Sequence, residues 1–187
     1  MSTVDIKYVG SPALFYNDEG ENIFRSTITE YDKKENSITV EELPPDIKVG
    51  GSCKLLILTN PVPQECLGRI KNDAGKLVIA IYKGHEKEQR GSVRYKVDFL
   101  GSIEKLIYDR SSYDLLSPVV VKILNLSSTG MRINAKPYTI LNGDRFLIRI
   151  FVNVDVKIMV AQVMNSKEVD SENAEYGCRF LTISGVK

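Results

Sequence analysis

The sequence is poor in the residues on which disulfide frameworks, metal sites and many hydrolytic active sites depend. Tryptophan is absent, histidine occurs once and cysteine occurs three times among the 187 residues. The cysteines, Cys53, Cys66 and Cys178, are odd in number, widely spaced and include no CxxC pair. This pattern predicts neither a disulfide framework nor a zinc site, and it indicates free thiols in a reducing compartment.

The single histidine, His85, lies in the charged segment "KGHEKEQRGS", where a solvated side chain is the simplest interpretation. The sequence contains no GxSxG, HExxH or GxGxxG pattern and no Walker phosphate loop. These are the local signatures of several common catalytic and nucleotide-hydrolysing sites. We therefore expect a protein that is not an enzyme and that uses no metal and no cofactor.

An excess of charge of one sign is also missing, because 25 lysines and arginines stand against 24 aspartates and glutamates. Proteins that neutralise a long phosphate backbone usually have a basic face, and those that bind single strands add exposed aromatic side chains. Binding of a nucleic acid polymer, for example by an OB-like barrel, is therefore disfavoured. A small anionic ligand stays open, because two or three arginines are enough to bind one.

Long apolar runs are absent as well. The longest fall far short of the ~20 residues that a membrane-spanning helix needs. The first ten residues show no basic stretch followed by an apolar one, so a signal peptide is not predicted. Apolar residues still make up 43% of the chain, which is enough for packed cores. We expect a cytoplasmic protein without a membrane segment.

Apolar and polar residues alternate with a period of two through most of the chain, which is typical of half-buried β-strands. The pattern runs through "ENIFRSTITEY", "NSITVEEL", "SCKLLILT", "CLGRIKN" and "KLVIAIY", and then through "RYKVDFLGSIEKLIY", "PVVVKILNLS", "GMRINA", "DRFLIRIFVNV", "VKIMVAQVMNS" and "YGCRFLTI". The charged, glycine-containing segment between the two sets is typical of a linker. The sequence therefore predicts an all-β chain of two small antiparallel β-barrels, residues 1–83 and 93–187, joined by a linker at 84–92.

Two arginines flank the end of this linker, in "RGSVR". Arg90 and Arg94 are separated by three residues, and side chains four apart in an extended segment point to the same side. Such a pair is common on solvated surfaces. It can equally form one half of a clamp for an anion, because the planar guanidinium group binds phosphate with two parallel hydrogen bonds.

A second motif follows about thirty residues later, in "NLSSTG". Asn125 and Ser127 favour tight turns by bonding to their own backbone, and Gly130 supplies a residue that tolerates positive φ. On its own this segment predicts a plain turn between two strands.

In this order and spacing, the two motifs resemble those of the PilZ domain family, which bind the bacterial second messenger cyclic di-GMP. The resemblance covers residues 88–183, and "YGCRFLTI" is similar to the closing strand of that barrel. Residues 1–83 resemble, more loosely, the small N-terminal barrel of flagellar-brake-type proteins. Many family members continue into a C-terminal helix, and none is predicted here.

The resemblance implies a set of ligand-binding residues for cyclic di-GMP: Arg90, Arg94, Asn125, Ser127 and Gly130, with Gln89 and Arg132 as secondary contacts. Arginine suits both the phosphates and the O6/N7 edges of the two guanines. Asn125 stands where many members have aspartate, and its amide offers one acceptor oxygen rather than two, so weaker affinity is expected. The residue at position 89 influences, in the family, whether one or two ligands bind.

The resemblance also implies a mechanism. A ligand held by Arg90 in the linker and by Asn125 in the second barrel would fix the linker against that barrel and reorient the two domains. The changed surface would control an unidentified protein partner, for example of flagellar, pilus or secretion machinery. The alternative is an adaptor of PilZ type that works through protein contacts without binding the nucleotide.

Overall fold

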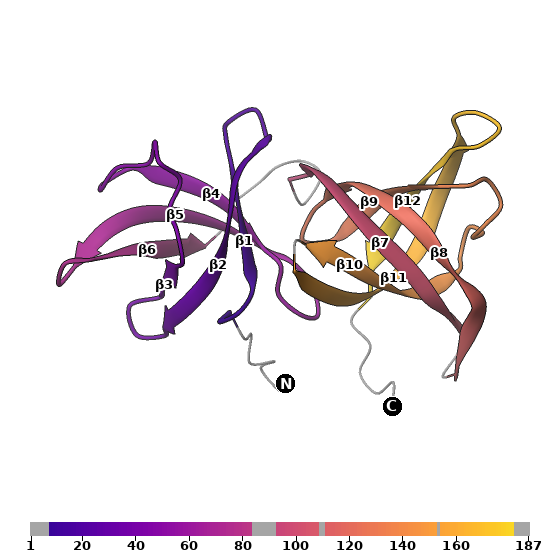
Figure 1. Ribbon diagram of the computed structural model, residues 1–187, viewed down its shortest axis with the longest axis horizontal. Helices are drawn as coiled ribbons and strands as arrows, with labels where there is room; N and C mark the ends of the chain where they lie inside the picture. Colours follow the sequence, from indigo (N-terminus) through magenta and orange to yellow (C-terminus); the bar gives the residue numbers. More distant parts are fainter. Residues whose placement is uncertain (1–7, 84–92, 109–110, 153, 182–187) are drawn as a thin grey trace. The chain divides into compact units, whose positions relative to one another are not determined.

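The computed structural model describes residues 8–83, 93–108, 111–152 and 154–181. Within these ranges every element of regular structure is a β-strand, and the twelve strands fall into two compact units, residues 1–95 and 96–187 (Figure 1). The described part of the chain contains no helix that could cross a membrane.

The first unit contains a closed barrel of six strands in the order β1-β2-β3-β6-β5-β4. Its strands are β1 (Pro12–Tyr16), β2 (Asn22–Asp32), β3 (Ser37–Val40), β4 (Ser52–Ile57), β5 (Gln64–Asp73) and β6 (Lys76–Lys83). All neighbouring pairs are antiparallel. Closure leaves no free sheet edge, and edge strands are the usual weak point of a small β-domain.

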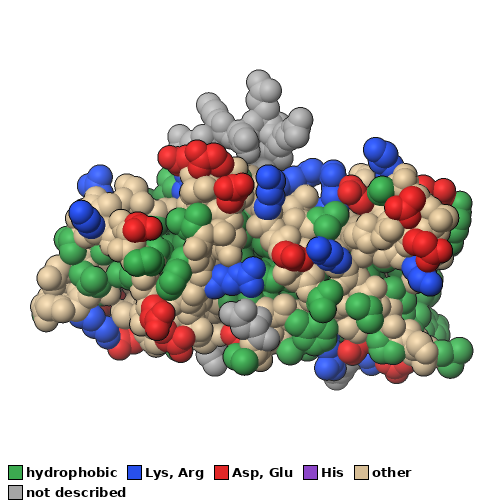
Figure 2. Space-filling model, turned by 45° about the horizontal axis from the view of Figure 1, so that its top comes forward, with side chains coloured by type: hydrophobic (Ala, Val, Ile, Leu, Met, Phe, Trp, Pro, Cys, Tyr) green, Lys and Arg blue, Asp and Glu red, His purple; other side chains and the backbone are tan. Residues whose placement is uncertain are grey.

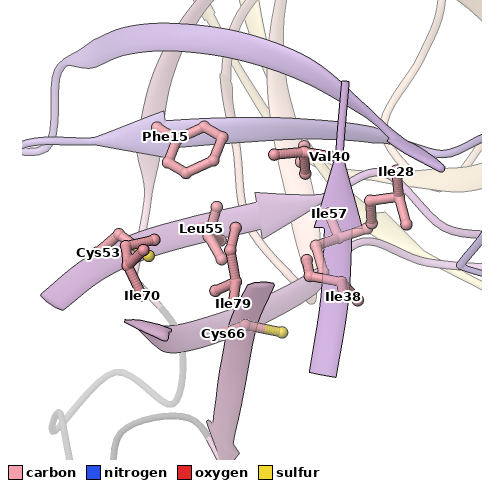
Figure 3. Close-up of a cluster of buried hydrophobic side chains, with 11 residues drawn as sticks. Phe15, Ile28, Ile38, Val40, Cys53, Leu55, Ile57, Cys66, Ile70 and Ile79 are labelled. Carbon is pink, nitrogen blue, oxygen red and sulfur yellow. The ribbon is translucent and has the colours of Figure 1, made fainter. Parts of the chain in front are cut away.

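Apolar side chains from all six strands fill the first barrel, and Figure 3 shows ten of them labelled. On β4 the inward residues are Cys53, Leu55 and Ile57, which is the alternation that the sequence predicts. Burial raises the pKa of the Cys53 thiol to about 11 and that of Cys66 to about 12. Both stay protonated at neutral pH, and the expectation of free thiols is confirmed, with Cys178 included.

The second unit is organised around a closed barrel in the order β10-β11-β12-β9-β8-β7. Its strands are β7 (Tyr95–Tyr108), β8 (Ser111–Leu126), β9 (Gly130–Ala135), β10 (Arg145–Val152), β11 (Asp155–Glu168) and β12 (Ala174–Phe180). The predicted all-β fold of two small barrels is confirmed. The predicted linker, residues 84–92, lies outside the described residues, and with it His85, Gln89 and Arg90.

One end of the second barrel collects the segments that carry the two motifs. Strands β8 and β9 pair antiparallel, and so do β9 and β12. The end of β8, the start of β9 and the end of β12 therefore lie at the same end of the barrel. The strand β7 lies beside β8 and follows directly after Arg94.

Candidate ligand-binding site

Two ion pairs across β7 and β8 show how these neighbouring strands are aligned. The Nζ atom of Lys122 lies 3.1 Å from Oδ1 of Asp98, and that of Lys105 lies 3.0 Å from Oδ1 of Asp114. The two pairs imply antiparallel alignments that differ by one residue, in keeping with the irregularity of β7 between Ile103 and Lys105, and both place the start of β7 beside the end of β8. Arg94 is exposed and is the residue immediately before that start.

A β-bulge in β8 decides where Asn125 points. Ile123 pairs with Ile133 but Asn125 pairs with Arg132, so Leu124 is one residue more than β9 matches. In a regular ladder without the bulge, the alternation that places Ile123 in the core would place Asn125 there too. The bulge turns Asn125 to the outer face instead, and bulges often re-aim a side chain in this way next to binding sites.

Arg132 lies on the same outer face, directly across from Asn125. Its Nη1 atom lies 3.3 Å from Oε2 of Glu175 on β12, and its side chain is 43% exposed. A guanidinium group has five N–H donors, so this one contact leaves others for a ligand. Arg132 is thus a candidate contact beside Asn125, as the resemblance implied for a secondary site residue.

Ser127 begins the turn between β8 and β9, and its hydroxyl bonds within that turn. It accepts hydrogen bonds from the backbone N–H of Gly130 (3.1 Å) and of Thr129 (3.3 Å), and it donates one to the carbonyl of Gly130 (3.2 Å). The Ser127 N–H also donates to the Gly130 carbonyl, at 2.9 Å. With Ser127 only 4% exposed, the hydroxyl shapes the turn rather than facing solvent.

The expectation that Gly130 occupies a positive φ is wrong, because it does not belong to the residues with positive φ. Its role is close approach to a neighbouring strand. A Cβ at position 130 would lie 2.1 Å from the carbonyl oxygen of Cys178 and 3.2 Å from the Cα of Arg179. Only glycine lets β9 start this close to β12. The motif therefore needs glycine at this position because of packing between strands, which the sequence alone does not reveal.

Arg179 is a basic residue at this end that the sequence analysis did not single out. It is exposed on β12 and pairs with Gly130, and its Nη2 donates to Oε1 of Gln162 at 3.1 Å. Because Gln162 is neutral, that hydrogen bond leaves the charge of Arg179 uncompensated. The signal was present in the alternation of "YGCRF", which puts Arg179 on the outer face.

The exposed guanidinium groups and the amide at this end of the barrel have the donors and the acceptor with which an anion or a base edge can be bound. Arginine forks and an amide come together on an exposed face, while no cluster of three or more potential metal-ligating side chains occurs among the residues described. Of the predicted site residues, the barrel brings together Asn125, Ser127, Gly130 and Arg132. Arg94 precedes the neighbouring strand β7, whereas Gln89 and Arg90 lie outside the described ranges.

Three solved structures illustrate what the chain is similar to. The inhibitor of motility MotI/DgrA from Bacillus subtilis is 14% identical, with a TM-score of 0.39 over 97% of this chain and 91% of that one. The PilZ domain of YcgR from Escherichia coli, solved with c-di-GMP, is 20% identical, with a TM-score of 0.39 over 52% and 81%. The MrkH–c-di-GMP complex from K. pneumonia is 12% identical, with a TM-score of 0.34 over 92% and 80%. No curated protein sequence matches the chain.

A family model for the PilZ domain matches residues 86–187, which is more than half of the chain. The match includes both motifs and the whole of the second barrel, from the arginines before β7 to the closing strand β12. The chain therefore belongs to the PilZ domain family.

Proposed function

We propose that this protein is a receptor for cyclic di-GMP and that Arg90, Arg94, Asn125, Ser127 and Gly130 form its binding site. The observation that carries the proposal is the bulge in β8, which turns Asn125 outward beside Arg132 at the end of the barrel where the arginine motif enters. A bulge that exposes a polar side chain beside an arginine gains nothing for the core. It suits a site that must present an acceptor and cationic donors together.

Each group has a distinct role in the proposal. Arg90 and Arg94 bind phosphate or the O6/N7 edge of guanine through their planar forks, and they stack on purine faces. The Asn125 amide oxygen accepts a hydrogen bond from a guanine edge. Ser127 and Gly130 act mainly by fixing the turn that holds Asn125, because the Ser127 hydroxyl bonds to the turn backbone.

Ligand binding also gives the protein its output in this proposal. A nucleotide held by both Arg90 and Asn125 fixes residues 84–92 against the second barrel, and the first barrel takes a new orientation. The ligand acts through its different affinities for the two arrangements, and no catalysis is involved. The result is a changed surface offered to a protein partner in a motility, secretion or biofilm-type process.

Isothermal titration calorimetry of the full chain with cyclic di-GMP, with GTP as the control nucleotide, tests the binding. Saturable heat with cyclic di-GMP and none with GTP is expected, and the stoichiometry shows whether one or two ligands bind next to Gln89. Absence of heat at ligand concentrations up to about 1 mM, which corresponds to about −4 kcal/mol, would favour the adaptor function instead.

Amide hydrogen exchange tests the reorientation separately. Residues 84–94 should gain protection at saturating ligand, and small-angle scattering should report a change in shape. If the ligand binds but amide exchange in that segment is unchanged, the protein is a receptor and the proposed domain reorientation is wrong.

A further inference from the structure

A row of apolar side chains crosses four neighbouring strands on the outer face of the second barrel. Phe151 on β10 pairs with Leu100 on β7 at one side and with Val156 on β11 at the other. The Asp98–Lys122 ion pair shows the alignment of β7 and β8 at this level, which brings Val120 on β8 close to Leu100. The row therefore runs from β8 through β7 and β10 to β11.

These apolar side chains are exposed to solvent and do not contribute to the core of the barrel. Their exposed fractions range from 41% for Phe151 to 70% for Val120, and two neighbours extend the row, Val154 at 97% and Ile158 at 47%. We call the six residues the apolar stripe: Val120, Leu100, Phe151, Val154, Val156 and Ile158. Together they expose roughly 500 Å² of largely apolar surface, the size of a patch that often has a function.

The borders of the stripe are charged but locally neutral. The Asp98–Lys122 ion pair lies along one side, and Oε2 of Glu104 lies 3.0 Å from Nε of Arg149 on the other side. Each of these two ion pairs joins one acid and one base. Figure 2 shows the same mixing on a wider scale, because acidic and basic side chains alternate with apolar ones over the visible face.

We propose that the apolar stripe is a self-association surface that packs against the same stripe of a second copy of this chain. A symmetric dimer brings identical patches together, and two sheet faces pack well at about 10 Å separation. A standard interface buries about 800 Å² per partner, of which about 57% is apolar, or about 450 Å². The stripe supplies that apolar core, and the neutral borders bring no net like charge together.

The border charges disfavour other occupants. An anionic membrane or a nucleic acid needs an uncompensated basic rim, whereas Lys122 and Arg149 are each paired with a carboxylate. The self-association is independent of the nucleotide, because the stripe contains none of the residues assigned to the ligand.

Sedimentation velocity of the full chain tests the proposal, at about 1 to 500 µM, the range in which interfaces of this size begin to associate. The wild-type dimer fraction should rise with concentration, with and without cyclic di-GMP. Leu100→Glu and Phe151→Glu should each weaken dimerisation at least tenfold. Both side chains lie on the outer face, so circular dichroism and thermal unfolding should show folded variants.

Leu116→Glu is the matched control, because Leu116 is also fully exposed on β8 but lies outside the stripe. It should dimerise like wild type. A wild-type chain that stays monomeric at 500 µM overturns the proposal, as does a control that dissociates as readily as the stripe variants. A monomer that binds vesicles containing phosphatidylserine would assign the stripe to a membrane instead.

Discussion

Two turns of this molecule connect neighbouring antiparallel strands, but one is held by its own backbone and the other by packing against a third strand. The β5–β6 turn in the first barrel is built locally: Ala74 and Gly75 have φ of 48° and 88°, and the Gly75 N–H donates to Oδ1 of Asn72 at 2.9 Å. The β8–β9 turn in the second barrel has a buried hydroxyl at Ser127 and a glycine pressed against another strand.

The difference shows which turn can serve as part of a site. A Cβ on Gly75 would meet nothing within 4 Å, so that turn is defined by its own backbone and not by packing against another strand. The turn at Gly130 is packed directly against the backbone of β12. A ligand that binds beside it meets a preformed surface, which lowers the entropic cost of binding.

Gly130→Ala should have the largest effect, because the new Cβ would overlap the carbonyl of Cys178. Overpacking against backbone should destabilise the second barrel by about 3 kcal/mol or more. Amide hydrogen exchange should show faster opening throughout residues 96–181, with the first barrel unaffected. Unchanged protection on β9 and β12 would mean that the close approach is not needed for stability.

Arg94→Ala should weaken cyclic di-GMP binding about ten- to a hundredfold without unfolding the protein, because a hydrogen bond to a charged group contributes about 1.5–3 kcal/mol. Arg90→Ala should act similarly. Arg145→Ala is a suitable control, since this exposed arginine begins β10 and pairs with Ile107, at the far end of β7 from Arg94. Calorimetry in which Arg94→Ala and Arg145→Ala bind equally well would remove Arg94 from the site.

Ser127→Ala should act mainly on stability. It removes the acceptor for the N–H groups of Thr129 and Gly130, at a cost of about 1–3 kcal/mol. Urea denaturation should detect this loss, while Ser171→Ala on the exposed β11–β12 loop should leave stability unchanged. The affinity for cyclic di-GMP should fall less than in the arginine variants. A larger loss of affinity than of stability would restore a direct ligand contact for Ser127.

Gly75→Ala tests the other turn. The substitution meets open space and only the positive φ opposes it, so the cost should be about 1 kcal/mol, well below that of Gly130→Ala. The same urea measurement serves both variants. Equal costs at the two positions would abolish the distinction between a locally built turn and one fixed by a neighbouring strand.

Asn125→Asp should have the smallest effect, and it should strengthen rather than weaken the binding of cyclic di-GMP. A carboxylate provides two acceptor oxygens for a guanine edge, so the affinity should stay the same or rise by less than tenfold, within about 1.4 kcal/mol. Calorimetry at two salt concentrations separates this gain from repulsion between the carboxylate and the phosphates. A large loss of affinity would show that the Asn125 amide donates rather than accepts.

The sequence predicts most of the fold because most strands have one buried and one exposed face. The strand that the alternation does not predict is β1, where all five residues of Pro12–Tyr16 are buried and the period of two disappears. The strand β8 is longer than predicted, because its polar first residues, from Ser111, lie before the valine-rich segment. Asp114 in this extension pairs with Lys105 on β7, a contact between strands that local sequence does not encode.

The sequence predicts which residue types occur in the candidate site, but it predicts less well why each of them is needed there. Gly130 was expected for its backbone freedom, and it is needed because a strand 48 residues later in the sequence presses against it at Cys178. The bulge at Leu124 leaves a faint trace, since the buried residues Ile123 and Leu126 are three apart rather than two or four. Such a trace becomes informative only when the pairing with β9 is known.

The bulge in β8 makes the site depend on how this strand pairs with β9 as well as on the identity of its residues. A relative with the same motif letters and the same number of residues, but with a regular ladder in place of the bulge, would turn its asparagine to the barrel interior. A relative with one residue fewer between positions 123 and 125 would need no bulge, because its asparagine would still pair with position 132 and face outward. The motif letters therefore identify a usable site only together with the register between the two strands.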